Sequence, residues 1–506
     1  MTRTAKASVY GINGPVATVK GDGFSVSEMV DIGGLQGEVI TLKPDMATMQ
    51  VYESTAGLRP NVPVAGTGQP MSITLQPGIV GNIFDGIMRP LGEITQKLWQ
   101  VRILVKIGQR LSEGEIYAEV DETPLITYKA MIPTGVSGTV THCAQNGEYT
   151  ATAPILTLND TTTLTLSQTW PIRIPRPVKA RQLLSQPLIT GQRIIDSLFP
   201  IAKGGTAAIP GGFGTGKTMT QHQLAKWCDA DLIVYIGCGE RGNEMTEVLE
   251  DFAKLTDPKN GQPLLNRTVL IANTSDMPVA AREASIYTGL TIAECYRDMG
   301  CHVAVMADST SRWAEALREL SGRLGEIPAE EGYPAYLATR LSAFYGRAGY
   351  VTNLNDTEGS VTIIGAVSPQ GGDFSEPVTQ QTKRFISCYW ALDRQLAYAR
   401  HFPAIDWMNS YSNYLPNLQN WYANNISPKF MGLREKFMTI LQEENALLEI
   451  VKLIGSDTLS ENQRNTLSLA KAIRQKFLQQ NAYDPADTFT SPKEQFALMA
   501  KLLTVS

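Results

Sequence analysis

Hydrophobic and polar positions alternate differently in each part of the chain. Up to about residue 70, short alternating runs lie between frequent glycines, at residues 8–10, 16–19, 37–40 and 49–52. Short strands at such close spacing are typical of a small β-barrel. We therefore predict an N-terminal β-barrel over residues 1–70. Its near balance of basic and acidic residues favours a structural barrel over a nucleic-acid-binding one.

Residues 95–170 are also β-like and are rich in Thr, Gly and Val, for example at 114–120 and 136–140. They interrupt the approach to the central region of the chain, so we predict an inserted β domain over this range. Residues 170–177 contain three prolines, which fix φ and favour an extended, stiff connector.

In the central region, strands alternate with segments of helix length. The nearly all-apolar runs are residues 232–236, 268–272, 303–307 and 361–366. Such runs are typical of a parallel sheet covered by helices on both faces. We assign residues 71–94 and 171–408 to this domain, because the predicted insert divides it. Ligands of such sheets bind at the carboxyl ends of the strands.

After about residue 409 the chain is predicted to be helical. Apolar residues recur at helical spacing from Leu433 to Val451, and the helix is expected to end near Gly455. Ser460 and Gln463 form a capping-box pair that predicts the start of a second helix. The fold class is therefore multidomain α/β, with an N-terminal barrel, a parallel-sheet domain carrying an inserted β domain, and a C-terminal helical domain over residues 409–506.

Composition narrows the function classes. The 506 residues carry a net charge of −5, which gives no electrostatic reason to expect a nucleic-acid partner. No apolar run of 18 or more residues occurs, and the N-terminus lacks the apolar core of a signal peptide, so we expect a cytoplasmic protein. The six cysteines and four histidines are scattered, which favours reduced thiols and argues against a histidine metal site.

Residues 211–218 fit the pattern of a phosphate-binding loop (P-loop), in which Gly-Lys-Thr follows a glycine and four other residues. The run 206–209 before the loop predicts a strand, and residues 219–227 after it predict a helix. Small residues let consecutive backbone N–H groups surround phosphate oxygens at the helix N-terminus. The expected phosphate-binding residues are Gly211, Gly212, Phe213, Gly214, Thr215, Gly216, Lys217 and Thr218. The alternative is a glycine turn that happens to precede Lys-Thr.

Within this loop, Lys217 would reach the outer phosphates and the Thr218 hydroxyl would bind Mg²⁺. A second metal-associated carboxylate is expected at the end of a neighbouring strand. Asp308 follows the apolar run 303–307 and is the candidate. The alternative, that Asp308 only caps the next helix, is common for such residues. A P-loop in the same predicted sheet favours the metal role.

Glu240 and Arg241 follow the run 232–236 in a glycine-containing loop, and are expected at the carboxyl edge of the sheet. Glu240 is the candidate that orients and polarises the attacking water. Arg241 could pair with the γ-phosphate or hold Glu240 in place. The alternative is a solvated acidic–basic pair, which is frequent in loops.

Together with further segments, these motifs resemble the catalytic A subunit of V-type and archaeal-type rotary ATPases. The resemblance rests on the P-loop, residues 237–244, 306–315 and 368–377, and also on 82–86, 204–206 and 401–405. It covers nearly the whole chain and is densest from about 187 to 410. The insert resembles the bulge of the A subunit, which the related synthase β subunit and flagellar-type export ATPases lack.

The resemblance implies ATP and ADP as ligands, with Mg²⁺. Lys217 and Thr218 would be phosphate and magnesium ligands, and Asp308 would be the strand-end aspartate near the metal. Glu240 would be the catalytic glutamate, with Arg241 beside it at the γ-phosphate. A flat base can stack between rings. Two residues match aromatic residues at the adenine: Phe402 and Tyr483.

The resemblance also implies a rotary complex that couples ATP hydrolysis or synthesis to rotor rotation and to proton or sodium transport. The chain would alternate with a non-catalytic B subunit in a three-plus-three heterohexamer, and an arginine of that subunit would complete the site in trans. Central rotor stalk and peripheral stalk subunits would be further partners. The chain would be cytoplasmic and peripheral to the membrane, meeting it only through the ion-translocating sector.

Several positions depart from the family pattern. Relatives often have Pro or Ala where this chain has Gly212, and Ser or Cys where it has Thr215. The insert is also shorter, and the chain ends sooner after Tyr483. A homohexameric ATPase for protein export stays open as an alternative, although the insert argues against it. A nucleotide-binding subunit without turnover is disfavoured by the intact P-loop and Glu240, and an RNA translocase by the uncharged barrel.

Overall fold

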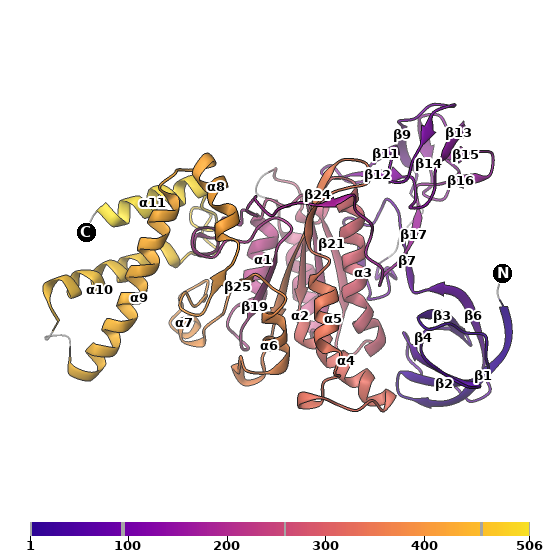
Figure 1. Ribbon diagram of the computed structural model, residues 1–506, viewed down its shortest axis with the longest axis horizontal. Coiled ribbons are helices and arrows are strands. Elements are labelled where there is room, and N and C mark those ends of the chain that lie inside the picture. The colour runs from indigo at the N-terminus through magenta and orange to yellow at the C-terminus, as the bar shows by residue number, and fades with distance from the viewer. Residues whose placement is uncertain (1–2, 93–96, 258–259, 456–458, 505–506) are drawn as a thin grey trace. The chain divides into compact units, whose positions relative to one another are not determined.

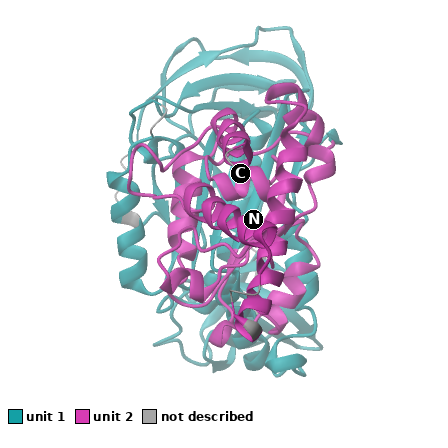
Figure 2. Cartoon of the chain, turned by 90° about the vertical axis from the view of Figure 1, so that its left-hand side faces the viewer, with its two compact units in different colours: residues 1–182, 231–365 teal, residues 183–230, 366–506 magenta. Residues whose placement is uncertain are grey.

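The computed structural model describes residues 3–92, 97–257, 260–455 and 459–504. The chain forms two compact units (Figure 2). Unit 1 contains residues 1–182 and 231–365, and unit 2 contains residues 183–230 and 366–506.

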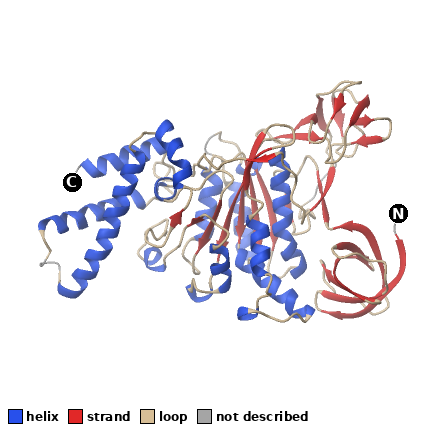
Figure 3. Cartoon of the chain, in the orientation of Figure 1, coloured by secondary structure: helices blue, strands red, loops and turns tan. Residues whose placement is uncertain are grey.

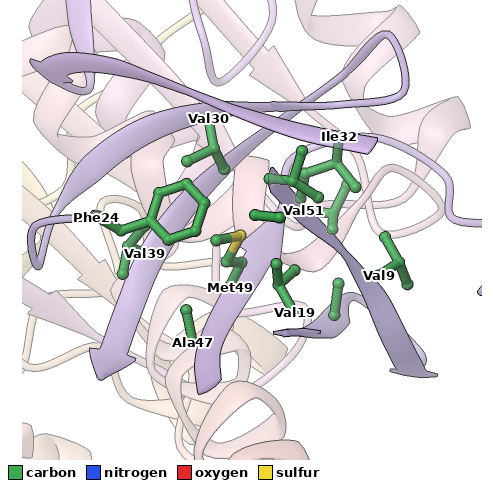
Figure 4. Packing of buried hydrophobic residues seen from close by; sticks show 12 residues of the cluster. Val9, Val19, Phe24, Val30, Ile32, Val39, Ala47, Met49 and Val51 are labelled. Atoms are coloured by element: carbon green, nitrogen blue, oxygen red, sulfur yellow. The ribbon is translucent and has the colours of Figure 1, made fainter. Parts of the chain in front are cut away.

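The N-terminal part of unit 1 is a closed barrel with the strand order β1-β2-β5-β4-β3-β6. Side chains on alternate strand positions point inward, and Figure 4 shows Val9, Val30, Val39 and Met49 among those that fill the interior. The barrel predicted from the sequence is confirmed. The strands are β1 Arg3–Asn13, β2 Val16–Lys20, β3 Glu28–Ile32, β4 Leu35–Lys43, β5 Met46–Val51 and β6 Pro63–Pro70.

The predicted insert is confirmed as a β structure of two antiparallel sheets, β10-β13-β15-β16 and β12-β11-β9-β14 (Figure 1). Its strands are β9 Trp99–Ile103, β10 Arg110–Leu111, β11 Ile116–Asp121, β12 Thr127–Met131, β13 Gly138–Cys143, β14 Gly147–Tyr149, β15 Leu156–Leu158 and β16 Thr162–Leu164. The expected connector begins as strand β17 Gln168–Pro171, which pairs with β7 Ser72–Leu75. The chain therefore enters and leaves the insert through one antiparallel pair.

Buried ion pairs hold the continuation of this connector. Arg173 contacts Glu38 on β4 at 3.0 Å and Glu283 at 2.7 Å, and both carboxylates are almost completely buried. Arg176 contacts Asp298 at 2.6 Å. A buried carboxylate is stable as an anion only when it is paired, so Arg173 ties the barrel to the remainder of unit 1.

The predicted apolar runs form parallel strands in unit 1, in the order β24-β22-β20-β21-β8. These strands are β8 Ile83–Phe84, β20 Leu232–Cys238, β21 Thr268–Asn273, β22 His302–Asp308 and β24 Glu358–Val367. The strands β18 Ala180–Arg181 and β23 Gly349–Thr352 extend the arrangement in antiparallel fashion. The helices of this unit are α2 Gly242–Lys254, α3 Val279–Asp298, α4 Thr310–Leu324 and α5 Leu337–Tyr345. Every residue of α3 is buried, as expected for a helix that covers a parallel sheet.

Unit 2 contains a π-helical turn, Ile194–Leu198, followed by β19 Thr206–Pro210 and α1 Lys217–Trp227. Strand β19 and helix α1 confirm the predicted strand and helix on either side of the P-loop. Strand β25 Cys388–Tyr389 pairs in parallel with β19, and β26 Tyr411–Ser412 pairs with β25 in the antiparallel sense. The other helices are α6 Pro377–Lys383, α7 Arg394–Tyr398, α8 Leu415–Asn425, α9 Phe430–Ile454, α10 Glu461–Ile473 and α11 Pro492–Thr504.

The predicted helical C-terminus is confirmed, because the described chain after β26 contains helices and connecting turns (Figure 3). The predicted capping box is also present. The Ser460 side chain accepts from the Gln463 N–H, and the Gln463 side chain accepts from the Ser460 N–H at 2.8 Å. Over the described ranges, no helix combines the length and the apolar character needed to cross a membrane.

Candidate active site

The P-loop of unit 2 connects the buried strand β19 to the first turn of α1. Gly214 and Gly216 have φ angles of 77° and 89°, a left-handed conformation that strains residues with a side chain. Gly216 is also the residue that precedes the first turn of α1. The loop therefore turns sharply and presents backbone N–H groups at a helix N-terminus, which is a favourable arrangement for an anion.

Hydrogen bonds within the loop hold the predicted residues together. The Lys217 amino group donates to the carbonyl oxygens of Gly211 at 2.7 Å and Gly212 at 3.1 Å. The Thr215 hydroxyl donates to the Gly212 carbonyl at 2.8 Å. Thr218 is exposed in the first turn of α1. The Lys217 amino group and the Thr218 hydroxyl thus belong to the same short segment as the backbone turn of the P-loop.

The first glycine of the loop is required by close packing. A Cβ atom at Gly211 would lie 2.5 Å from the Thr215 hydroxyl oxygen and 2.8 Å from Cβ of Leu392. Both distances are shorter than side-chain contacts allow, so no larger residue fits without a shift of the loop. Phe213, at the tip, is 85% exposed and takes no part in this packing.

A pocket of about 690 Å³ opens beside the P-loop within unit 2. Gly214, Gly216 and Met219 line it on the loop side, and the predicted aromatic residues Phe402 and Tyr483 line it elsewhere. Phe402 is 42% exposed and Tyr483 is 82% exposed, so neither ring belongs to the hydrophobic core. The remaining wall is rich in amides, including Gln223, Gln475, Gln479 and Asn481. The pocket can accommodate a flat heterocycle that has hydrogen-bonding edges.

Arg193, which the sequence analysis did not identify, holds one wall of this pocket. Its guanidinium donates to the carbonyl oxygens of Phe477 at 2.7 Å and Gln479 at 2.6 Å. It also pairs with Asp487 at 2.6 Å. These contacts fix the segment 479–483, which lies between an irregular helical turn and a loop. No local sequence pattern marks Arg193, because its partners are almost 300 residues away along the chain.

In unit 1, two carboxylates follow the ends of adjacent parallel strands. Asp308 is the last residue of β22 and is in register with Gly237 of β20. Strand β20 ends at Cys238, and Glu240 follows shortly after that strand end. Asp308 is 3% exposed. The N-cap of α4 is Ser309, whose hydroxyl accepts from the Arg312 N–H, so capping is not the role of the Asp308 side chain.

Burial and neighbouring charges change the acidity of Glu240. Burial, together with the negative charge of Asp308, raises the pKa of Glu240 to about 8, and Glu244 adds to this effect. The Arg312 guanidinium acts in the opposite direction. Glu240 therefore binds a proton more tightly than an exposed carboxylate does, and its pKa lies close to neutral pH, where general acid–base catalysis is most effective.

Arg312, which no sequence motif marks, carries a positive charge that lowers the pKa of Glu240. Arg312 also pairs with Glu315 at 3.0 Å. Arg241, the predicted neighbour, is exposed at the residue preceding α2, and the ion pairs of the described residues do not include it. The structure thus leaves the Arg241 side chain directed to solvent rather than paired with Glu240. Arg312 is in the first turn of α4, a position that the strand pattern does not reveal.

The donor set of the predicted metal residues fits a hard divalent cation. Asp308 supplies a buried carboxylate beside a second one, and hard cations such as Mg²⁺ prefer oxygen ligands. Within the described residues, no group of three or more His, Cys, Asp or Glu side chains could hold a metal by itself.

Comparison with protein families gives matches along most of the chain. The ATP synthase alpha/beta family nucleotide-binding domain matches residues 191–412, and the family's beta-barrel domain matches residues 9–68. The barrel-sandwich domain of the ATP synthase alpha/beta subunit matches residues 94–173. The C-terminal domain of V and A type ATP synthase matches residues 419–505.

Individual relatives match nearly the full length of the chain. The V-type ATP synthase alpha chain 2 of Clostridium tetani is 59% identical over 97% of this chain and 87% of its own length. The A subunit of the A-type ATP synthase from Methanopyrus kandleri is 53% identical over 99% of this chain and 90% of its own length. Among solved structures, the ATPase EscN of the enteropathogenic E. coli type III secretion system has a TM-score of 0.72 and 22% identity, covering 98% of this chain and 100% of that one. This last likeness concerns the fold alone.

Proposed function

Because the chain belongs to the ATP synthase α/β family, in the branch of the V-type and A-type A subunits, we propose that it is the catalytic ATP-hydrolysing or ATP-synthesising subunit of a rotary complex. The observation that carries the proposal is an intact P-loop in a chain that also places Asp308 and Glu240 at, or just after, the ends of two adjacent parallel strands. A subunit that only binds nucleotide needs the first feature but not the second.

The nucleotide is ATP or ADP, and its phosphates bind to the N–H groups of residues 211–218 and to Lys217. On phosphate binding, the Lys217 amino group exchanges its two loop carbonyls for phosphate oxygens. Thr218 and Asp308 are the residues that would hold Mg²⁺, which supplies positive charge to the phosphates when it is bound. Phe402 packs against the adenine and Tyr483 covers its outer side, at the pocket beside the loop.

Glu240 orients the attacking water and accepts its proton as the bond from the water oxygen to the γ-phosphorus forms, while the bond from the γ-phosphorus to the bridging oxygen breaks and ADP leaves. Its pKa of about 8 makes it a better proton acceptor than an exposed carboxylate, whose conjugate acid is much stronger. Arg241 is exposed, and we propose that it turns toward the γ-phosphate when nucleotide is bound. The positive charge of Arg312 partly offsets the repulsion between the negative charges of Asp308 and Glu240.

Similarity to subunits of V-type and A-type ATP synthases supports the partners that we propose. In a three-plus-three heterohexamer, this chain alternates with a non-catalytic B subunit, which supplies the transition-state arginine in trans. Central rotor stalk and peripheral stalk subunits transmit rotation, which is coupled to proton or sodium transport by a separate membrane sector. The chain is thereby peripheral to the membrane, on its cytoplasmic side. The proposed domains are residues 1–70, 71–94 with 171–408, 95–170, and 409–506.

The test is ATP hydrolysis by the purified chain alone and after co-assembly with the B subunit of the same organism. We expect little turnover alone, a large increase in the complex, and no turnover in a complex carrying Lys217→Ala. A chain that assembles with itself into an active hexamer would favour the export-ATPase alternative. Turnover that persists with Lys217→Ala would remove the P-loop from the reaction.

A further inference from the structure

Arg394 lies against the P-loop, although no motif marks it. The residues around it are anchored to the strand that leads into the loop. The Leu392 N–H donates to the Pro210 carbonyl at 2.8 Å, and the Asp393 carboxylate accepts from the Leu396 N–H at 2.7 Å. Arg394 follows directly as the first residue of α7. The backbone before Arg394 is therefore tied to the strand that leads into the loop, and the Asp393 cap sets the start of the helix that carries Arg394.

The Arg394 guanidinium occupies the space in which a side chain at Gly212 would lie. A Cβ atom at Gly212 would be 2.7 Å from Nε and 2.8 Å from Nη2 of Arg394. A Cβ atom at Gly372 would be 3.5 Å from Cζ of the same guanidinium. The Arg394 guanidinium thus lies next to two backbone segments without side chains, at Gly212 of the P-loop and at Gly372.

The charge of Arg394 lacks an acidic partner among the ion pairs of the described residues. Other arginines of unit 2 have one, since Arg193 pairs with Asp487 at 2.6 Å and Arg474 pairs with Glu444 at 2.8 Å. A second cation, the Lys217 amino group, lies 3.1 Å from the carbonyl oxygen of the same Gly212. Two cations at one peptide repel each other unless an anion is present. Phosphate oxygens bound by the loop are an anion with which the Arg394 guanidinium can pair.

We propose that Arg394 is a second phosphate-binding cation of the P-loop, and that Gly212 is present because any side chain there displaces it. The inference rests on the proposed function, since it assigns a further residue to the same nucleotide site. A guanidinium has a planar set of donors that suits phosphate oxygens, and it remains charged at every physiological pH. Arg394 is exposed, and in the proposal it contributes mainly to nucleotide binding rather than to the chemical step.

The proposal predicts a specific pattern in four variants. Arg394→Ala should raise the Kd for ATP about fivefold, the upper range for an exposed charge pair, with little change in kcat. Arg394→Lys should retain most of the affinity because it keeps the charge. Gly212→Ala should weaken ATP binding to a similar extent, because the new methyl group pushes the flexible guanidinium away. The double variant should bind no more weakly than either single variant.

The experiment measures ATP affinity and steady-state ATPase of the complex assembled from each variant chain and the B subunit, at low and high salt. Arg384→Ala is the matched control, since Arg384 is an exposed arginine of the same unit that bonds to Gln381 rather than to the P-loop. Salt screens exposed charges, so the loss of affinity in Arg394→Ala should shrink as ionic strength rises.

Three results would overturn the inference: unchanged affinity in Arg394→Ala, a loss that does not depend on salt, or additive losses in the double variant. Failure of the proposed function gives a different result. In that case the wild-type complex would not hydrolyse ATP, or Lys217→Ala would have no effect, whatever Arg394 does.

Discussion

The Tyr235 hydroxyl donates a hydrogen bond of 3.1 Å to Oδ2 of Asp308. Both residues belong to adjacent parallel strands, and Tyr235 is fully enclosed by the structure. Burial and the Asp308 charge raise the pKa of Tyr235 well above its ordinary value, so the hydroxyl remains a donor at every physiological pH. The bond orients the carboxylate at the strand end, where its charge helps to raise the pKa of Glu240.

Tyr235→Phe removes this bond while keeping the ring that packs against Phe252, at a centroid distance of 5.3 Å. We expect the variant complex to need a higher Mg²⁺ concentration for half-maximal ATPase, because Asp308 is oriented less well. The free energy of unfolding should fall by about 1 kcal/mol, the usual loss for one buried hydrogen bond. A Mg²⁺ titration identical to that of the wild type would show that the Tyr235 hydrogen bond does not position Asp308 for metal binding.

Phe402→Ala should raise the KM for ATP about tenfold, because stacking of a base on an aromatic ring is typically lost on truncation to alanine. Tyr483→Ala should have a smaller effect, since the Tyr483 ring is 82% exposed and covers the base only from outside. Tyr398→Ala is the matched control, because Tyr398 is 83% exposed and does not line the pocket. Equal KM values for Phe402→Ala and Tyr398→Ala would contradict the assignment of the base pocket.

His401 gives a prediction about pH. Burial, with a contribution from the Arg474 charge, lowers the pKa of His401 to about 4 from an ordinary value of 6.5. Between pH 4 and pH 6.5, His401 is therefore protonated in the unfolded chain but mostly neutral in the folded chain. Because the unfolded state binds the extra proton, the free energy of unfolding falls as the pH is lowered from about 6.5 toward 4. His401→Phe keeps the ring contact with Trp407 but removes the titration. Its unfolding midpoint should fall less steeply than the wild-type midpoint over this range, and parallel curves would refute the assignment.

Local patterns were sufficient for much of the fold. The strand before the P-loop, the helix after it and the capping box at Ser460 were predictable because each depends on a few consecutive residues. Barrel strands β3 and β6 were not predicted. Strand β6, at Pro63–Pro70, carries two glycines and a proline at each end, which local propensities assign to turns. Pairing with β1 and β3 holds it extended.

The candidate site was predictable only where chemistry follows from a short motif. The P-loop residues, Glu240 and Asp308 come from such motifs, and their roles at the nucleotide stay predictions. Arg193, Arg312 and Arg394 were missed, because each acts on residues that are near in space but lie in other elements or at an unremarkable helix position. Arginine is common on helix surfaces, so its sequence context does not separate a site residue from a solvated one.

The most direct test of the account measures bound ATP and steady-state turnover in the same preparation of the complex, for the wild type and for Glu240→Gln. The substitution keeps the size and polarity of the side chain and removes its ability to accept a proton. The account predicts that ATP remains bound with near wild-type affinity while turnover falls by about a hundredfold or more. Near-normal turnover in Glu240→Gln would contradict the central claim that this glutamate activates the hydrolytic water.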